Sequence, residues 1–408
     1  MKAQQVNTNL EQMKNILFIT WDGPQTTYME GLFMPIFNQI QKEKKYRFHV
    51  IQFTWGSHER ILITQKKAVD FDINFTSKKI HRNPNALIGS FYTLVNGVSF
   101  LKKYLEKNEI DIIMPRSIMP SIMVNRINNK KYKILFDADG LPIEERLDFS
   151  GLKKNSILYK IYKKEEKAML INADAVITRS QKAISFHIST IGDNFKDNFF
   201  VVVNGRDSQF FKADINLNNQ TREELNIKKD TKVFIYSGSL GPQYGWEIMI
   251  KIFKKYLQIN YNSIFLIITG NLEFAAKRIP AALQNHIIIK SAPFADIPKY
   301  LSIGDIAFAI REPKPSMKGV APIKLGEYLL TGIPTIASAR IGDTEDLLKD
   351  KNFCFIYEHD SINSLENSLK FILKTGELNK EEIQKFGVNN FSIEVSAASY
   401  SKALDYCS

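Results

Sequence analysis

Residues 321–335, APIKLGEYLLTGIPT, carry the clearest structural signal in the sequence. Pro322 stands at the start of a helical run and Gly332 just after it, as is typical of helix starts and stops. Lys324 and Glu327 are three residues apart and therefore share one face of this helix. A carboxylate there suits two hydroxyl hydrogen bonds from a sugar ring, and an ammonium beside it suits a phosphate. The same spacing also fits an ordinary ion pair on a helix surface.

On both sides of this stretch, short apolar runs alternate with helical patterns. Strands are expected at 15–20, 48–54, 68–75, 111–116, 133–137, 175–178 and 200–203, and then at 232–237, 265–269, 286–290, 306–310, 335–338 and 354–356. Helices are expected at 28–42, 90–107, 156–171 and 181–190, and then at 246–257, 297–302, 324–330, 344–348 and 361–375. This rhythm predicts an α/β protein with two doubly wound parallel sheets, joined near residues 203–207 and a polar stretch at 214–223. Ligands would bind in the cleft between the halves.

The composition is that of an ordinary globular protein. Of 408 residues, 44% are hydrophobic and 24% charged, which excludes a disordered tail or a fibre. Cys354 and Cys407 form no CxxC pair, so we expect neither a disulfide framework nor a cysteine-ligated zinc site. The N-terminus lacks a signal-peptide pattern, and no apolar run approaches the roughly 20 residues that cross a bilayer. We therefore expect a cytoplasmic protein.

The net charge of +12 is concentrated in the first half of the chain. Residues 1–200 carry 30 Lys and Arg against 20 Asp and Glu, whereas residues 201–408 carry 25 against 23. The excess is greatest at 153–167, KKNSILYKIYKKEEK, where lysines alternate with apolar residues at helical spacing. Such a segment suits an anionic membrane surface, but it is equally typical of a solvated helix face. No nucleic-acid-binding pattern is present, and no nucleic acid partner is expected.

Two glycine-containing turns follow predicted strands. Gly23 lies in WDGPQTT at 21–27, and three glycines lie in YSGSLGPQYGW at 236–246. Glycine lets the backbone approach a ligand closely, and the following helix offers N–H groups to an anion. Both turns also fit simple connections. The spacing of Asp137 and Asp139 could hold a divalent cation or form a strand-end turn.

Taken in order, these motifs resemble those of the retaining glycosyltransferases of the GT-B fold, the family 4-like bacterial group that builds surface polysaccharides. The matching segments are the first glycine turn, VVVNGRD at 201–207, YSGSLGPQYG at 236–245 and PIKLGEYLLTGIPTIAS at 322–338. The resemblance implies two Rossmann-like domains facing across a cleft: an acceptor-binding domain at 1–203 and a nucleotide-sugar-binding domain at 204–390. It also implies a helix at 391–408 that returns to the first domain.

The resemblance also implies roles for individual residues. Glu327 matches the glutamate that binds the ribose hydroxyls, and Gly238 and Ser239 match the loop under the diphosphate. Gly23 matches the loop near the donor sugar. The other donor-binding positions implied are Arg206, Val320, Ala321, Ile323 and Lys324. Asp139 and Lys324 are the expected catalytic residues.

The sequence departs from the family pattern at three positions. Many relatives carry a sugar-contacting glutamate where this chain has Gly319, and cations where it has Ser239 and Tyr244. Lys324, Lys318, Arg311 or Arg206 would then have to replace the missing diphosphate cations.

The activity implied is retaining transfer of a sugar from a nucleotide sugar, UDP- rather than GDP-linked, to a lipid-linked or growing glycan acceptor. No metal cofactor is expected, and peripheral contact of the basic N-terminal domain with the inner membrane face is a further expectation. Two alternatives stay open: a non-catalytic nucleotide-sugar- or glycan-binding protein, and a nucleotide-sugar 2-epimerase.

Overall fold

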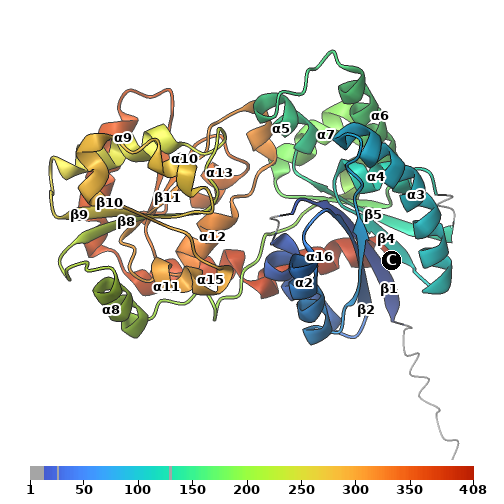
Figure 1. Ribbon diagram of the computed structural model, residues 1–408, viewed down its shortest axis with the longest axis horizontal. Helices are drawn as coiled ribbons and strands as arrows, with labels where there is room; N and C mark the ends of the chain where they lie inside the picture. The colour runs from blue at the N-terminus through green and yellow to red at the C-terminus, as the bar shows by residue number, and fades with distance from the viewer. Residues whose placement is uncertain (1–12, 25–26, 128–130) are drawn as a thin grey trace, which may run out of the picture. The chain divides into compact units, whose positions relative to one another are not determined.

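The structure, a computed structural model, describes residues 13–24, 27–127 and 131–408 and contains two sheets (Figure 1). The first sheet has the strand order β3-β2-β1-β4-β5-β6-β7, and the second has the order β10-β9-β8-β11-β12-β13. Every strand pair whose register is described is parallel. This arrangement confirms the predicted α/β class with two doubly wound sheets.

The strands of the first sheet are β1 (Lys14–Asp22), β2 (Tyr46–Thr54), β3 (Asn74–Lys79), β4 (Ile112–Pro115), β5 (Lys133–Asp139), β6 (Ala175–Thr178) and β7 (Phe199–Val201). The strands of the second are β8 (Lys232–Ser237), β9 (Ser263–Ile268), β10 (Ile287–Lys290), β11 (Ile306–Ala309), β12 (Thr335–Ser338) and β13 (Cys354–Tyr357).

The helices up to β7 are η1 (Met29–Phe33), α1 (Met34–Gln41), α2 (His58–Asp70), α3 (Ala86–Lys107), α4 (Ile118–Val124), α5 (Pro142–Phe149), α6 (Ile157–Asn172), α7 (Gln181–Ile191) and η3 (Asp193–Asn198). Those after β7 are α8 (Ile215–Glu224), α9 (Trp246–Leu257), α10 (Leu272–Ala276), η4 (Ala281–His286), η5 (Phe294–Asp296), α11 (Ile297–Leu301), η6 (Pro315–Gly319), α12 (Ile323–Leu330), α13 (Thr344–Leu348), α14 (Ser364–Lys374), η7 (Thr375–Glu377), α15 (Lys380–Phe391) and α16 (Ile393–Cys407).

By its internal contacts the chain forms two compact units. The first comprises residues 1–138, 164–176 and 401–408, and the second comprises 139–163 and 177–400. Helix α16 therefore contributes its last residues to the first unit, where the Tyr46 hydroxyl donates to Asp405 Oδ1 at 2.7 Å.

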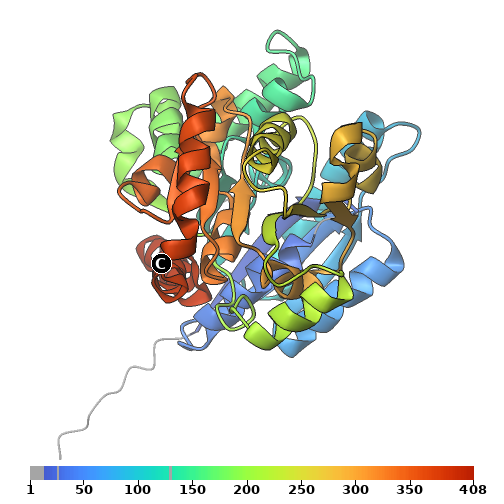
Figure 2. The same ribbon diagram turned by 90° about the vertical axis from the view of Figure 1, so that its left-hand side faces the viewer.

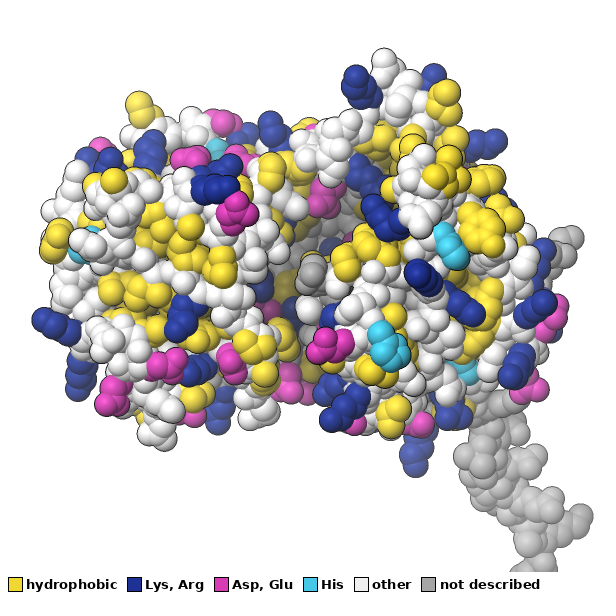
Figure 3. Space-filling model, in the orientation of Figure 1, with side chains coloured by type: hydrophobic (Ala, Val, Ile, Leu, Met, Phe, Trp, Pro, Cys, Tyr) yellow, Lys and Arg dark blue, Asp and Glu magenta, His cyan; other side chains and the backbone are white. Residues whose placement is uncertain are grey.

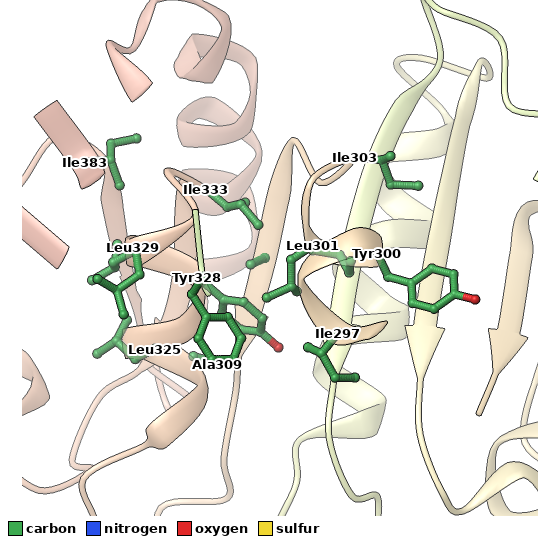
Figure 4. Packing of buried hydrophobic residues seen from close by; sticks show 14 of the residues in the cluster. Ile297, Tyr300, Leu301, Ile303, Ala309, Leu325, Tyr328, Leu329, Ile333 and Ile383 are labelled. Atoms are coloured by element: carbon green, nitrogen blue, oxygen red, sulfur yellow. The ribbon is translucent and has the colours of Figure 1, made fainter. Parts of the chain in front are cut away.

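Two apolar cores cover the two faces of the second sheet. Helices α9 and α14 pack on one face and α11, α12 and α15 on the other, so helices lie on both sides of the strands (Figure 1 and Figure 2). Figure 4 shows the core on the side of α11, α12 and α15, with labelled side chains of α11 and α12 lying beside one another against the sheet. Because both faces are buried, the strands are continuous apolar runs rather than alternating ones.

One sequence-based expectation about the fold is wrong. Residues 68–75 are not one strand: α2 runs to Asp70, and β3 begins only at Asn74. The side chain of Ser57 caps α2 by accepting from the N–H of Arg60 at 3.2 Å, and this fixes the helix. The polar stretch 214–223, to which the sequence analysis assigned no element, is mostly helix α8, capped by Asp214.

Within the described part of the chain, no helix combines the length and apolar character needed to cross a membrane.

Candidate functional site

Glu327 lies on α12 and is completely buried between two cations. The Arg206 Nε donates to Glu327 Oε1 at 2.9 Å, and the Lys324 Nζ donates to Oε2 at 3.2 Å. Burial alone raises the pKa of Glu327, but the charges of Lys324 and Arg206 outweigh it and lower that pKa. The carboxylate is therefore ionised. The sequence predicted that Lys324 and Glu327 share a face, and the structure shows that they are paired.

Tyr328, the next residue on α12, fixes this helix to the end of β8. Its hydroxyl accepts from the backbone N–H of Ser237 at 2.9 Å, and the side chain is fully buried. Figure 4 shows the ring of Tyr328 among the apolar side chains of the core. The turn that begins at Gly238 is thus held at a fixed distance from α12. The motif reasoning did not assign Tyr328 a role, although it stands beside Glu327.

Lys324 lies against the glycine turn that follows β8. A Cβ added at Gly238 would lie 3.1 Å from Lys324 Cε, so the ammonium-bearing side chain passes directly beside the turn. The neighbouring Ser239 is exposed, and its carbonyl accepts from the Tyr236 hydroxyl. Of the candidate replacements for the missing diphosphate cations, Lys324 is thus placed at the predicted diphosphate loop.

The segment that leads into α12 is ordered by hydrogen bonds from elsewhere in the second unit. The side-chain amide of Asn204 donates to the Ala321 carbonyl at 3.1 Å, and the Val320 N–H donates to the Met317 carbonyl at 3.1 Å. Pro322 is the N-cap residue of α12 and provides no side-chain cap. The N–H groups of the first helical turn, which begins at Ile323, therefore have no side-chain acceptor on the cap residue. Asn204 is a further positioning residue that the motif reasoning did not single out.

Arg206 is held by the backbone that surrounds the start of α16. Its N–H donates to the Phe391 carbonyl at 2.7 Å, and its guanidinium lies 5.7 Å from the centre of the Phe294 ring. A Cβ at Gly205 would lie 2.5 Å from Ser396 Cβ, so only glycine fits the close approach that brings Arg206 to Glu327.

Asp139 and Asp137 point to different partners. Asp139 has a left-handed backbone, with φ of 64°, and its Oδ1 lies 3.9 Å from the Arg179 Nε. Asp137 is fully buried, and its Oδ2 accepts from the Arg116 NH1 at 2.9 Å. Within the residues that the structure describes, no group of three or more His, Cys, Asp or Glu side chains could hold a metal ion.

A second charged cluster of the same unit lies around Glu145 of α5. Burial raises the pKa of Glu145, and the charge of Arg311 opposes this while that of Asp139 adds to it. The Arg311 NH1 donates to Gln243 Oε1 at 3.1 Å, and its guanidinium lies 4.9 Å from the Tyr244 ring centre. Arg311 is thus fixed beside the glycine turn at 238–245. The sequence reasoning missed Glu145, whose only signal is its place in the helix after Asp139.

Gly319 is the position at which the resemblance led us to expect a glutamate in relatives, and the backbone around it leaves no room for a side chain. A Cβ at Gly319 would lie 2.6 Å from the N of Leu141, and a Cβ at Gly140 would lie 2.2 Å from the Gly319 carbonyl oxygen. Lys318 is exposed, and its carbonyl accepts from the Ser180 hydroxyl at 2.6 Å. The absence of the glutamate is therefore built into the packing of this chain.

Gly23 lies in the first unit, directly after β1. The preceding Asp22 accepts from the side chains of Thr20 and Gln52, both at 2.8 Å. Gln25 and Thr26 of the same turn lie outside the described residues.

Comparison with known proteins decides the enzyme class. Residues 218–386 match the family described as Glycosyl transferases group 1. The chain has the GT-B fold. It is a transferase of the EC 2.4 class, as the sequence predicted.

Solved structures support the same fold over nearly the whole chain. HepE from Anabaena, in complex with UDP, has a TM-score of 0.70 at 14% identity and covers 96% of this chain and 100% of its own. A glycosyltransferase from Rickettsia africae has a TM-score of 0.69 at 15% identity, covering 97% and 98%. Sucrose-phosphate synthase from Thermosynechococcus elongatus has a TM-score of 0.69 at 13% identity, covering 96% and 98%. No curated protein matches the sequence.

Proposed function

We propose that this glycosyltransferase transfers a sugar from a UDP-sugar to a lipid-linked or growing glycan acceptor, with retention of configuration, in surface polysaccharide biosynthesis. The observation that carries the proposal is the pairing of the buried Glu327 with the buried Arg206 and the partly exposed Lys324, beside the turn at Gly238. UDP is favoured over GDP because HepE, of the same fold, is seen with UDP and with UDP-glucose.

In this proposal Glu327 binds the ribose. A carboxylate accepts hydrogen bonds only and has about four acceptor positions, so two cations leave acceptors for two hydroxyls. Lys324 is partly exposed and covers one carboxylate oxygen, whereas Arg206 is buried on the other. When the donor binds, Lys324 turns from Glu327 to the diphosphate and Arg206 stays to hold the carboxylate.

The same residues stabilise the leaving group. During transfer, negative charge grows on the diphosphate as the bond to the sugar breaks. The N–H groups at the start of α12 and the ammonium of Lys324 are oriented before the reaction, so they stabilise that charge without reorganisation. We assign Asp139 to the acceptor side of the reaction and propose attack on the same face as departure. In this proposal the domains are 1–203 and 204–390 with the helix at 391–408, Gly23 lies near the donor sugar, and no metal is required.

A non-catalytic binding role is the second candidate, favoured by the packing at Gly319. The close contact of Gly319 with Leu141 excludes the glutamate that contacts the donor sugar in many family members. A protein that binds the nucleotide but transfers no sugar would fit this loss. Release of UDP from UDP-sugar in the presence of lipid extract supports the transferase, and donor binding without any release supports the binding role.

Calorimetry with a series of nucleotides tests the donor site. We expect wild type to bind UDP about 100-fold more tightly than 2′,3′-dideoxy-UDP, since two hydroxyl hydrogen bonds to a charged group are lost and each is worth about 1.5 kcal/mol. Glu327→Gln should bind both alike. Wild type should bind UDP more tightly than UMP because Lys324 meets the second phosphate. Lys324→Met should lose this difference in affinity, whereas the control Lys314→Met, at an exposed lysine, should keep it. Equal discrimination in wild type and Glu327→Gln would contradict the ribose assignment.

A further inference from the structure

Helix α3 exposes a continuous apolar face. The side chains concerned are each more than half exposed, and they are Leu87, Ile88, Phe91, Tyr92 and Val95. Positions 87, 91 and 95 are four residues apart and 88 and 92 flank them, so these side chains lie on one side of the helix over its first three turns. A contiguous exposed patch of this kind is unusual on a protein with no partner for it.

The opposite face of α3 is packed too closely for the helix to turn its apolar face inward. A Cβ at Gly89 would lie 2.3 Å from the His81 carbonyl oxygen, and a Cβ at Gly97 would lie 2.4 Å from Met123 Sδ. The Thr93 hydroxyl donates to the Gly89 carbonyl at 2.8 Å and accepts from the His81 N–H at 2.9 Å. The small residues of α3 therefore fix its orientation, and the exposed face is a stable feature of the first unit.

The segment that carries this face is basic, and its first acidic side chain, Glu106, comes one turn after Lys102 and Lys103 near the end of α3. Between Asp72 and Glu106 the sequence has no Asp or Glu and carries Lys78, Lys79, Arg82, Lys102 and Lys103. Four of these five cations are exposed, and the fifth, Lys78, lies over the Phe100 ring at 3.9 Å. Figure 3 shows hydrophobic side chains gathered over the segment labelled α3 in Figure 1, with Lys and Arg side chains around them.

We propose that the apolar face of α3, with its cations, is a docking surface for an anionic lipid bilayer. An apolar helix face enters the boundary between headgroups and acyl chains, while flanking Lys and Arg meet anionic headgroups. The excess of cations over acids, with five Lys and Arg and no Asp or Glu at 73–105, favours this partner over a protein surface of mixed charge. The proposal rests on the lipid-linked acceptor of the proposed function and names the surface for the membrane contact that the sequence led us to expect. That surface is distinct from the basic segment 153–167, whose helix exposes only Ile157, Ile161 and Ile171 among its large apolar residues.

Vesicle co-sedimentation without any nucleotide sugar tests this surface. Wild type should bind vesicles that contain phosphatidylglycerol, bind pure phosphatidylcholine weakly, and lose binding as salt rises. The triple variant Leu87→Ser, Phe91→Ser, Val95→Ser should bind about 100-fold more weakly, because three side chains no longer enter the bilayer. The matched control Leu62→Ser, Ile63→Ser, Val69→Ser removes exposed apolar residues from α2 of the same unit and should bind as wild type.

Two further variants test whether the face inserts into the bilayer and whether its cations meet the headgroups. Phe91→Trp should show a blue-shifted emission on the vesicles, and Lys102→Gln with Lys103→Gln should reduce the salt dependence. Wild-type binding by the α3 triple variant would overturn the proposal. So would a wild-type dimer that the triple variant converts to monomers, since a second copy would then cover α3. UDP binding by the triple variant reports on the donor site alone, so failure of the donor-site proposal would leave this one standing.

Discussion

Replacing Glu327 with Gln tests the central ion pairs of the second unit. The glutamine carbonyl can still accept from Arg206, but its NH₂ group then faces the Lys324 ammonium, so two donors oppose each other. Arg206 also loses the opposite charge that compensates its burial. Removing one partner of a buried ion pair costs about 3–5 kcal/mol, and because one hydrogen bond survives we expect about 3 kcal/mol. For a unit of this size, that lowers Tm by about 6–12 °C.

Differential scanning calorimetry of the apo protein measures this effect. Glu273→Gln is the matched control, since Glu273 pairs with Lys277 on the surface of the same unit and both side chains are exposed. Exposed pairs contribute about 0.2–1 kcal/mol, so the control should melt within about 4 °C of wild type. The double variant Arg206→Met, Glu327→Gln should recover part of the loss, because no uncompensated buried cation remains. Equal melting of wild type and Glu327→Gln would refute the reasoning.

The difference in Tm between wild type and Glu327→Gln should depend on pH, because the pKa of Glu327 is lowered in the folded protein. A carboxyl group whose pKa is lower in the folded state stabilises it at pH values above its ordinary pKa of 4.5. That contribution is lost as pH falls from there through the folded-state pKa. The difference in Tm between wild type and Glu327→Gln should therefore be constant near neutral pH and narrow below about pH 4.5. A difference that widens in acid would contradict the assignment of an ionised Glu327.

Two further predictions concern packing in the second unit. Gly319→Glu should destabilise the protein by about 3 kcal/mol in urea unfolding rather than restore a sugar-contacting glutamate, because its Cβ meets the backbone N of Leu141. The control Gly241→Ala should unfold as wild type, because a Cβ at Gly241 has no neighbour within 4 Å. Tyr328→Phe leaves the buried Ser237 N–H without its hydroxyl acceptor and should lower the free energy of unfolding by about 1–2 kcal/mol in the same assay. UDP should also bind more weakly, because the turn at Gly238 is no longer fixed to α12. Unchanged stability and UDP binding would rule out a positioning role for Tyr328.

The sequence predicted the elements that local pattern determines. Strands β8 and β12 and helix α9 begin and end where expected, because a buried apolar run or a strong helical period ends there at polar, glycine or proline residues. Residues 68–75 were misassigned because Val69, Phe71, Ile73 and Phe75 alternate as in a strand. The capped helix that begins at His58 continues through the first of these residues and overrides the pattern.

At the site, the prediction succeeded where the contacts are short in sequence. The pairing of Lys324 with Glu327 follows from helical spacing alone. The ion pair between Arg206 and Glu327 joins residues 121 positions apart, and no local pattern contains it. The crowding at Gly319 is likewise invisible in the sequence, because it depends on where the fold places Leu141.

The missing loop cations and the buried ion pairs have one electrostatic explanation. Arg206 and Lys324 carry two positive charges against the single negative charge of Glu327, so the set holds a net positive charge beside Gly238. The start of α12 adds the positive end of a helix dipole at the same place. Glu327 keeps the two cations together without neutralising both, and Lys324, the more exposed of the two, is the one that can turn to a phosphate. In the proposed function, this surplus charge does the work of the cations that Ser239 and Tyr244 replace.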